Sequence, residues 1–197
     1  KSSTWRAIAA GLPERSGGAA LDYQDIADAL TVVLGKRKAS ITGVPIGWPS
    51  YAWPINEPLD FLGGDGGAGI GSGPGIAIGA ALALKDSGRV PVAILGDGDT
   101  TMGINALWTA AKYHIPLLIV VANNRSYFND ELHQERIART RGRPEENRWI
   151  GQRLEDPVPD IPALARGFGW AAADAVATKD DLVQAMTDAV ATVVAGG

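Results

Sequence analysis

Two short polar segments have the residue types to bind a metal ion together with a phosphate-bearing ligand. Gly96-Asp97-Gly98 places a carboxylate between two glycines, and Asn123-Asn124 supplies amide oxygens further along the chain. Mg²⁺ prefers oxygen ligands in octahedral geometry and usually keeps water and substrate phosphates in its shell. A carboxylate, an amide oxygen and a nearby backbone carbonyl would be the protein's share of that shell. The glycines would let the backbone approach a diphosphate closely.

Each polar segment follows a predicted buried strand. Apolar runs predict strands at 90–95 and 117–122, and the segment 103–113 between them predicts a crossover helix. The N-terminus of that helix would face the diphosphate. Because ligands bind beyond the carboxyl ends of strands in open parallel sheets, we expect Asp97 and Asn124 to converge on one spot.

The remaining pattern indicates an α/β fold, a three-layer αβα domain with a mainly parallel sheet. Further helices are predicted at 22–34, 75–84, 128–140, 161–168 and from 179 onward, and further strands at 39–42 and 170–176. We expect residues 1–20 to form an arm or linker and residues 21–197 to form one domain. The stretch 43–75 is rich in Gly, Pro and Trp and has no period, and such long loops are usually functional.

Composition narrows the class of protein. The chain has 197 residues, which fits one domain, a net charge of −4 and no cysteine. Without a basic field we expect no nucleic-acid partner, and without a cysteine no thiolate chemistry. No apolar run approaches the roughly 20 residues of a membrane span, and no signal peptide begins the chain, so a cytoplasmic location is expected. The first residue, Lys1, and the last segment suggest a piece of a longer polypeptide or a processed subunit.

The two polar segments and their spacing resemble the signature of thiamine diphosphate enzymes. The spacer from Ile104 to Pro116 is similar to that of the benzoylformate decarboxylase and acetolactate synthase group. The upstream segment 69–75 (Gly-Ile-Gly-Ser-Gly-Pro-Gly) resembles the same group's glycine-rich turn, and the segment 160–169 is also similar. The resemblance covers most of residues 20–197, and it implies a diphosphate-binding (PP) domain with the thiamine diphosphate-binding fold.

The resemblance also implies a role for each site residue. Asp97, Asn124 and the Ser126 carbonyl would ligate Mg²⁺. Ile70 would be the bulky apolar wedge that holds the cofactor bent, and the Ala68 carbonyl would accept a hydrogen bond from the pyrimidine amino group. The implied cofactor-binding set is Ala68, Ile70, Gly96, Asp97, Gly98, Asp99, Asn124, Ser126 and Tyr127, with Ile70 and His133 as candidate catalytic residues.

The family's activating glutamate lies on a pyrimidine-binding domain that this sequence lacks. The resemblance therefore implies half of a site, completed by the rest of the polypeptide or by a partner subunit in a homo- or hetero-oligomer, a dimer or tetramer. The expected activity is that of a lyase or carboligase acting on 2-oxo acids or 2-hydroxyketones. A non-catalytic or regulatory subunit that keeps the fold is the alternative reading.

Several residues carry competing interpretations. Asp99 stands where the family often has Ser or Ala, and its carboxylate would repel a diphosphate unless it points elsewhere. Ile70 alone would be interpreted as a core residue, and His133 as a surface residue of a mostly solvated helix. The match to GxGxxG at Gly64–Gly69 permits a dinucleotide-binding oxidoreductase domain, but the acidic residue expected to close the next strand is missing at the usual distance.

Overall fold

A three-stranded parallel sheet forms the centre of the molecule. The computed structural model describes residues 20–63 and 69–196. Strands β1 (Ala39–Gly43), β2 (Val90–Gly96) and β3 (Leu118–Ala122) lie in the order β1-β2-β3, and all pair in parallel. The crossover between β2 and β3 makes them neighbours, with Gly96 opposite Ala122 at their carboxyl ends. This confirms the predicted three-layer αβα architecture.

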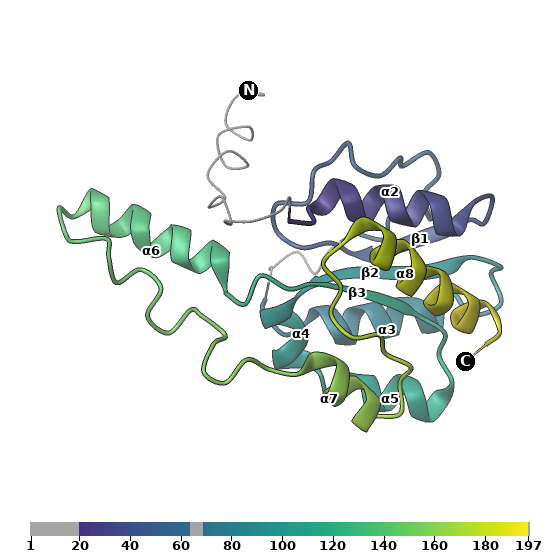
Figure 1. Cartoon of the computed structure of the whole chain (residues 1–197). Coiled ribbons are helices and arrows are strands. Elements are labelled where there is room, and N and C mark those ends of the chain that lie inside the picture. Colours follow the sequence, from purple (N-terminus) through teal and green to yellow (C-terminus); the bar gives the residue numbers. More distant parts are fainter. Residues whose placement is uncertain (1–19, 64–68, 197) are drawn as a thin grey trace.

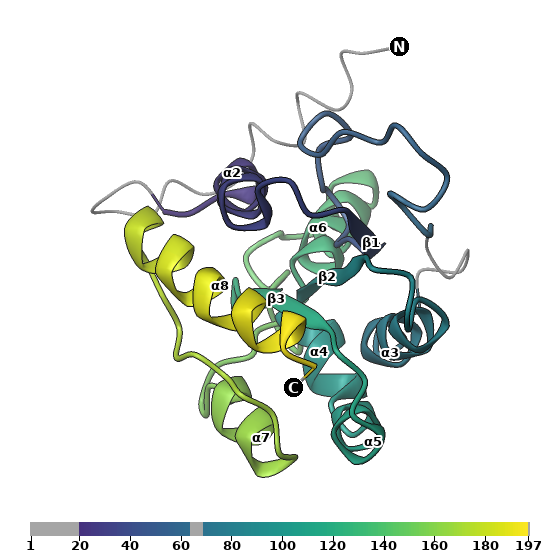
Figure 2. The same ribbon diagram turned by 90° about the vertical axis from the view of Figure 1, so that its right-hand side faces the viewer.

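Two helices cover one face of the sheet (Figures 1 and 2). α2 (Tyr23–Leu34) and α8 (Lys179–Val194) pack together there, and their apolar residues meet those that strands point to this side, such as Val92 and Ile94. α2 begins at the Asp22 capping box, in which Asp22 and Asp25 each accept the other's backbone N–H. Lys179 also pairs with Asp25 and joins the two helices.

In the described part of the chain, four helices cover the opposite face. They are α3 (Gly73–Ala83), α4 (Asp97–Gly103), α5 (Ala106–Tyr113) and α7 (Ile161–Gly167). Ala93 and Leu95 of β2 point to this side, so alternate residues of one strand enter the two cores. α3 is apolar almost throughout, with Ala77 and Ala81 buried against the sheet.

One predicted strand is wrong. Residues 170–176 run irregularly beside the core and join no strand in the part of the chain that the structure describes. The Trp170 indole N–H donates to the Leu107 carbonyl at 2.8 Å, and an Arg166 guanidinium N–H donates to the Ala172 carbonyl at 3.0 Å. These side-chain bonds hold the segment against α5 and α7 and take the place of a strand ladder.

The helix α6 (Phe128–Thr140) and the return segment 141–153 project from the body of the molecule (Figure 1). Arg139 pairs with Glu135 and Glu145, and Arg148 also pairs with Glu135, so these ion pairs tie the helix to its own return segment. None of the helices that the structure describes has the length and apolarity needed to cross a bilayer.

Candidate functional site

The predicted convergence of Asp97 and Asn124 is present at the carboxyl ends of β2 and β3. The backbone N–H of Ser126 donates to Asp97 Oδ2 at 3.2 Å and to Asn124 Oδ1 at 2.9 Å. Both side-chain oxygens therefore lie within hydrogen-bond distance of one nitrogen. A carboxylate and an amide oxygen placed side by side suit a hard divalent cation.

The backbone around Ser126 faces the same point. Ser126 and Arg153 form an antiparallel bridge, flanked by Tyr127 N–H to the Gln152 carbonyl and Leu154 N–H to the Arg125 carbonyl, each 2.8 Å. In an extended residue the N–H and C=O point to the same side. Because the Ser126 N–H points at the two oxygens, its carbonyl is directed to that side as well, as a third metal ligand requires.

Asp97 is only 3% exposed. Burial raises its pKa above the ordinary aspartate value, and hydrogen bonds from the backbone N–H groups of Gly98, Arg125 and Ser126 only partly counteract this effect. A buried carboxylate whose ionised form is disfavoured gains from a nearby cation, because the opposite charge favours that form.

Asp97 opens a helix that the sequence pattern did not predict. α4 begins directly at Asp97, whereas a single helix at 103–113 was expected, and α5 follows separately. The backbone N–H groups of Gly98 and Asp99 therefore belong to the first turn of α4, where N–H groups have no intrahelical acceptor. The hydroxyls of Thr100 and Thr101 donate back to the carbonyls of Gly96 and Asp97, both at 2.7 Å, within the same helix.

The two glycines beside Asp97 serve different purposes. A Cβ on Gly96 would meet nothing within 4 Å, which leaves room for a ligand at this position. A Cβ on Gly98 would lie 2.3 Å from Cε1 of Tyr127. Gly98 thus lets the Tyr127 ring lie directly against the first turn of α4.

Gly98→Ala should destabilise the fold by about 1–3 kcal/mol, because the new methyl group forces the Tyr127 ring or α4 to move. Gly79→Ala in α3 is the matched control: its Cβ would meet nothing within 4 Å, and alanine should stabilise a helix interior by about 0.5–1 kcal/mol. Urea denaturation measures both. A Gly98→Ala variant as stable as the Gly79→Ala variant would contradict the close packing.

The glycine-rich turn places Ile70 at the surface. Ile70 is 47% exposed, so the interpretation as a core residue is wrong. An exposed branched side chain beside α4 fits the predicted wedge. Ala68, the predicted acceptor of the pyrimidine amino group, lies outside the described residues, as does most of the GxGxxG match.

The Asp99 side chain points to the glycine-rich turn. Its Oδ1 accepts the backbone N–H of Gly71 at 2.6 Å and that of Gly73 at 3.2 Å. The carboxylate is therefore bound to the glycine-rich turn, while the Asp99 backbone stays in the first turn of α4.

Glu131 was not predicted as a site residue. The sequence places it on a charged helix expected to be solvated, yet it is 4% exposed and accepts the Ser126 hydroxyl at 2.5 Å. Arg153 lies 3.5 Å from the same carboxylate oxygen. Glu131 therefore braces the loop that carries Asn124 and Ser126, and only its place in the first turn of α6, five residues after Ser126, could have signalled this role. His133, two residues after Glu131 on the same helix, is exposed.

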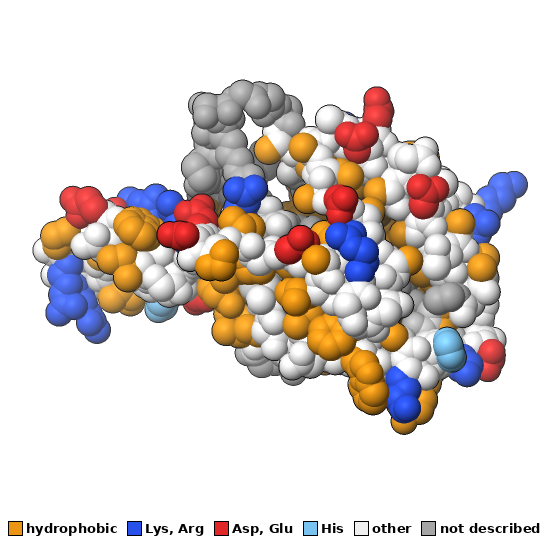
Figure 3. Space-filling view, turned by 60° about the horizontal axis from the view of Figure 1, so that its bottom comes forward, with side chains coloured by type: hydrophobic (Ala, Val, Ile, Leu, Met, Phe, Trp, Pro, Cys, Tyr) orange, Lys and Arg blue, Asp and Glu red, His pale blue; other side chains and the backbone are white. Residues whose placement is uncertain are grey.

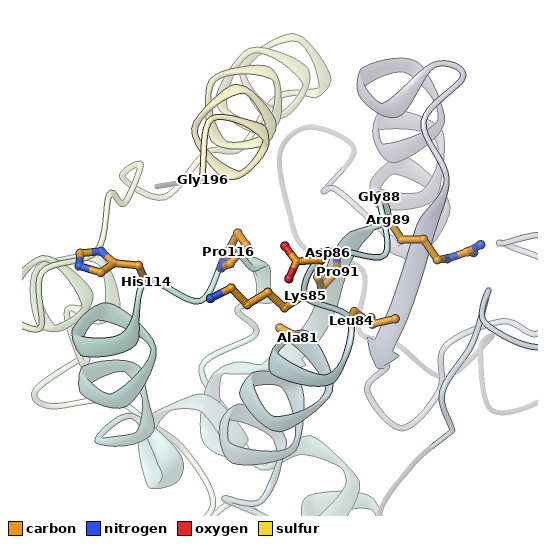
Figure 4. A pocket seen from close by; sticks show the side chains of 10 residues that line it. All are labelled: Ala81, Leu84, Lys85, Asp86, Gly88, Arg89, Pro91, His114, Pro116 and Gly196. Atoms are coloured by element: carbon orange, nitrogen blue, oxygen red, sulfur yellow. The ribbon is translucent and has the colours of Figure 1, made fainter.

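A hollow of about 360 Å³ lies at the other end of the sheet (Figure 4). It is lined at the entries of β2 and β3 by Pro91 and Pro116, and by Lys85 and His114. The Arg89 side chain points away from it and donates instead to Ser40 Oγ at 2.7 Å, and it pairs with Asp60. The hollow shares no residue with the Asp97 and Asn124 site.

The chain matches the family model described as thiamine pyrophosphate enzyme, C-terminal TPP binding domain, over residues 42–195. It is 34% identical over 133 residues to benzoylformate decarboxylase of Pseudomonas aeruginosa, a match that covers 62% of this chain and 21% of the relative. It is 27% identical over 175 residues to a probable acetolactate synthase large subunit of Methanocaldococcus jannaschii, covering 85% of this chain and 27% of the relative.

A solved structure has the same fold. The thiamine diphosphate-dependent 4-hydroxybenzoylformate decarboxylase of Rhodococcus jostii RHA1 superposes with a TM-score of 0.72 at 28% identity. The superposition covers 92% of this chain and 32% of that one. The chain thus spans between a fifth and a third of the length of these similar proteins.

Proposed function

Since this chain belongs to the thiamine pyrophosphate enzyme family, we propose that it binds the diphosphate of the cofactor through Mg²⁺. It corresponds to the C-terminal TPP-binding domain of enzymes similar to benzoylformate decarboxylase and acetolactate synthase. We propose further that it forms part of a lyase or carboligase acting on 2-oxo acids or 2-hydroxyketones. The alternatives are a non-catalytic subunit with the same fold and, less favoured, a dinucleotide-binding domain.

One observation carries the proposal of a metal. The oxygens of Asp97 and Asn124 share the Ser126 N–H, and the Ser126 carbonyl is directed to the same side. This donor set is entirely oxygen and contains one carboxylate, which matches how Mg²⁺ is held when phosphates complete its shell. The open space beside Gly96 leaves room for that ligand.

Each residue of the proposed site would have its own role in binding the cofactor. Asp97, Asn124 and the Ser126 carbonyl hold Mg²⁺, and the backbone N–H groups of Gly98 and Asp99 bind diphosphate oxygens. When bound, thiamine diphosphate supplies an electron sink for making or breaking a carbon–carbon bond next to a carbonyl. Ile70 presses on the bound cofactor and fixes its conformation, and the Tyr127 ring closes the site over Gly98.

The described residues of this chain bring no glutamate of a pyrimidine-binding domain to the proposed site. We propose that a pyrimidine-binding domain, attached or on a partner subunit of an oligomer, supplies a glutamate, and that residues 21–197 form the PP domain. Figure 3 supports such a contact, because hydrophobic side chains gather on the face that carries α5 and α7. Trp108, Tyr113 and Leu164 on these helices are between 42% and 61% exposed, and exposed apolar patches of this kind mark interaction surfaces.

Turnover of 2-oxo acids tests the proposed reaction. We expect the 197-residue chain alone to show none, and the enzyme assembled with a pyrimidine-binding domain to release CO₂ or to join two carbonyl substrates. A screen of 2-oxo acids with and without an acceptor aldehyde distinguishes decarboxylation from carboligation. Robust turnover by the isolated chain would contradict the half-site, and cofactor binding without any turnover in the assembled protein would favour the non-catalytic subunit.

His133 is the second candidate catalytic residue. Its exposed place on the projecting helix α6 favours the interpretation as a surface residue. We therefore expect His133→Ala to keep kcat and KM within about twofold of the wild-type values, as surface substitutions usually have small effects. A loss of kcat/KM that depends on which 2-oxo acid is used would instead assign His133 to substrate binding or proton transfer.

A further inference from the structure

The Asp99 carboxylate connects two segments that are far apart in the sequence. It lies in the first turn of α4, two residues after Asp97, and its Oδ1 accepts the N–H groups of Gly71 and Gly73. Gly71 directly follows Ile70, and Gly73 is the first residue of α3. The same short helix therefore carries the proposed metal ligand and holds the turn that carries the proposed wedge.

Three glycines make this contact possible. A Cβ on Gly73 would lie 1.9 Å from Asp99 Oδ2, and a Cβ on Gly103 would lie 2.4 Å from the Gly71 carbonyl oxygen. Gly71 itself has a φ of +94°, a backbone conformation that residues with a side chain rarely adopt. The glycine-rich turn and α4 thus fit each other closely at both ends of α4.

A charged acceptor strengthens the contact. Hydrogen bonds from backbone N–H groups to a carboxylate are stronger than those between neutral groups. Asp99 also lies at the N-terminus of α3, where a negative charge is favourable. Ile70 sits at the exposed end of a turn that is otherwise anchored at Gly71 and Gly73.

We propose that Asp99 is a positioning residue that fixes Ile70 relative to the metal ligand Asp97, through the N–H groups of Gly71 and Gly73. The proposal rests on the proposed function, because Ile70 acts as a wedge only if this site holds thiamine diphosphate. Asp99 touches neither the metal nor the reacting atoms in this role. Its effect passes through the shape of the glycine-rich turn.

The test compares Asp99→Ala and Asp99→Asn with the wild type in the assembled enzyme. In Asp99→Ala the amides of Gly71 and Gly73 should exchange with deuterium at least about tenfold faster, because hydrogen bonds to a charged acceptor are lost. Because the released turn would no longer hold Ile70 in place, kcat should fall about tenfold. The affinity for thiamine diphosphate should change by less than about threefold, because the metal ligands are unchanged. Asp99→Asn keeps an acceptor oxygen and should restore most of both values.

Asp180→Ala is the matched control, since Asp180 also lies in the first turn of a helix, α8, on the opposite face of the sheet. Unchanged exchange at Gly71 and Gly73 in Asp99→Ala would overturn the contact. Faster exchange with an unchanged kcat, or equal losses of kcat and cofactor affinity, would overturn the positioning role. If the wild-type enzyme bound no thiamine diphosphate, the proposed function itself would fail, whereas the exchange rates would still report on the contact.

Discussion

Asp97→Ala abolishes Mg²⁺-dependent binding of thiamine diphosphate, with an expected loss of affinity of at least about 100-fold. The change removes the only charged oxygen among the three proposed ligands, and loss of even an outer partner of a metal ligand costs roughly 10–100-fold. Calorimetric titration of the cofactor into the assembled enzyme, with Mg²⁺ present, measures the affinity of each variant.

The effect of Asp97 on folding stability differs from its proposed effect on metal binding. Because burial raises the pKa of this carboxyl group, its ionised form costs stability in the metal-free protein at neutral pH. That cost is absent below the ordinary aspartate range, grows as the pH rises through it and is complete above the raised pKa, so Asp97→Ala removes this cost at pH 7. Asp180→Ala should keep wild-type affinity. An Asp97→Ala variant that binds the cofactor as tightly as the wild type would sink the metal assignment.

Ile70→Ala should lower kcat about 100-fold while leaving the affinity for thiamine diphosphate within about threefold of the wild-type value, since misplacement by about 1 Å can cost a factor of this size. Ile70 is half-exposed and is not one of the proposed metal ligands, so its truncation should leave metal binding intact. Steady-state kinetics on a 2-oxo acid, combined with cofactor titration, give the two numbers.

Two variants sharpen the interpretation of Ile70. Ile70→Leu keeps the bulk of the side chain and should keep most of the activity. Ile76→Ala makes the same truncation on α3, where Ile76 is 36% exposed, and should affect neither number by more than about twofold, as is usual for surface changes. Equal losses of kcat and cofactor affinity in Ile70→Ala would indicate a plain packing role.

The sequence predicted the site best where it depends on strand order. Apolar runs marked β2 and β3, and parallel pairing of neighbouring strands brings their carboxyl ends together, so Asp97 and Asn124 converge as expected. The helices α2, α6 and α8 also began at or next to their predicted residues. Asp22 and Thr178 cap the first and last of these through their side chains.

The features that the sequence did not predict depend on contacts that form only in the folded chain. The short helix α4 is hidden because Gly, Asp and Thr are poor helix formers, and tertiary contacts with the glycine-rich turn stabilise it. Glu131 looks solvated in sequence because its partners, Ser126 and Arg153, are set by folding. The segment 170–176 was predicted as a strand, yet four of its seven residues are alanine, which is depleted in strands, and the Trp170 and Arg166 side chains bind it to the helical layer.

The departure at Asp99 became informative only with the structure. A second carboxylate beside a diphosphate site looks unfavourable in the sequence, and the direction of its side chain cannot be inferred from spacing. The contacts with Gly71 and Gly73 supply both the explanation and a role.

The proposed site binds thiamine diphosphate through Mg²⁺ that is held by Asp97, Asn124 and Ser126. The most direct test of this proposal is calorimetric titration of thiamine diphosphate into the wild-type assembled enzyme, once with Mg²⁺ and once with a chelator that removes divalent cations. We expect saturable binding with Mg²⁺ and a loss of affinity of at least about 100-fold in the chelator, because the metal ion would link the cofactor to the protein. Equal affinity under both conditions, or no binding with Mg²⁺, would contradict it.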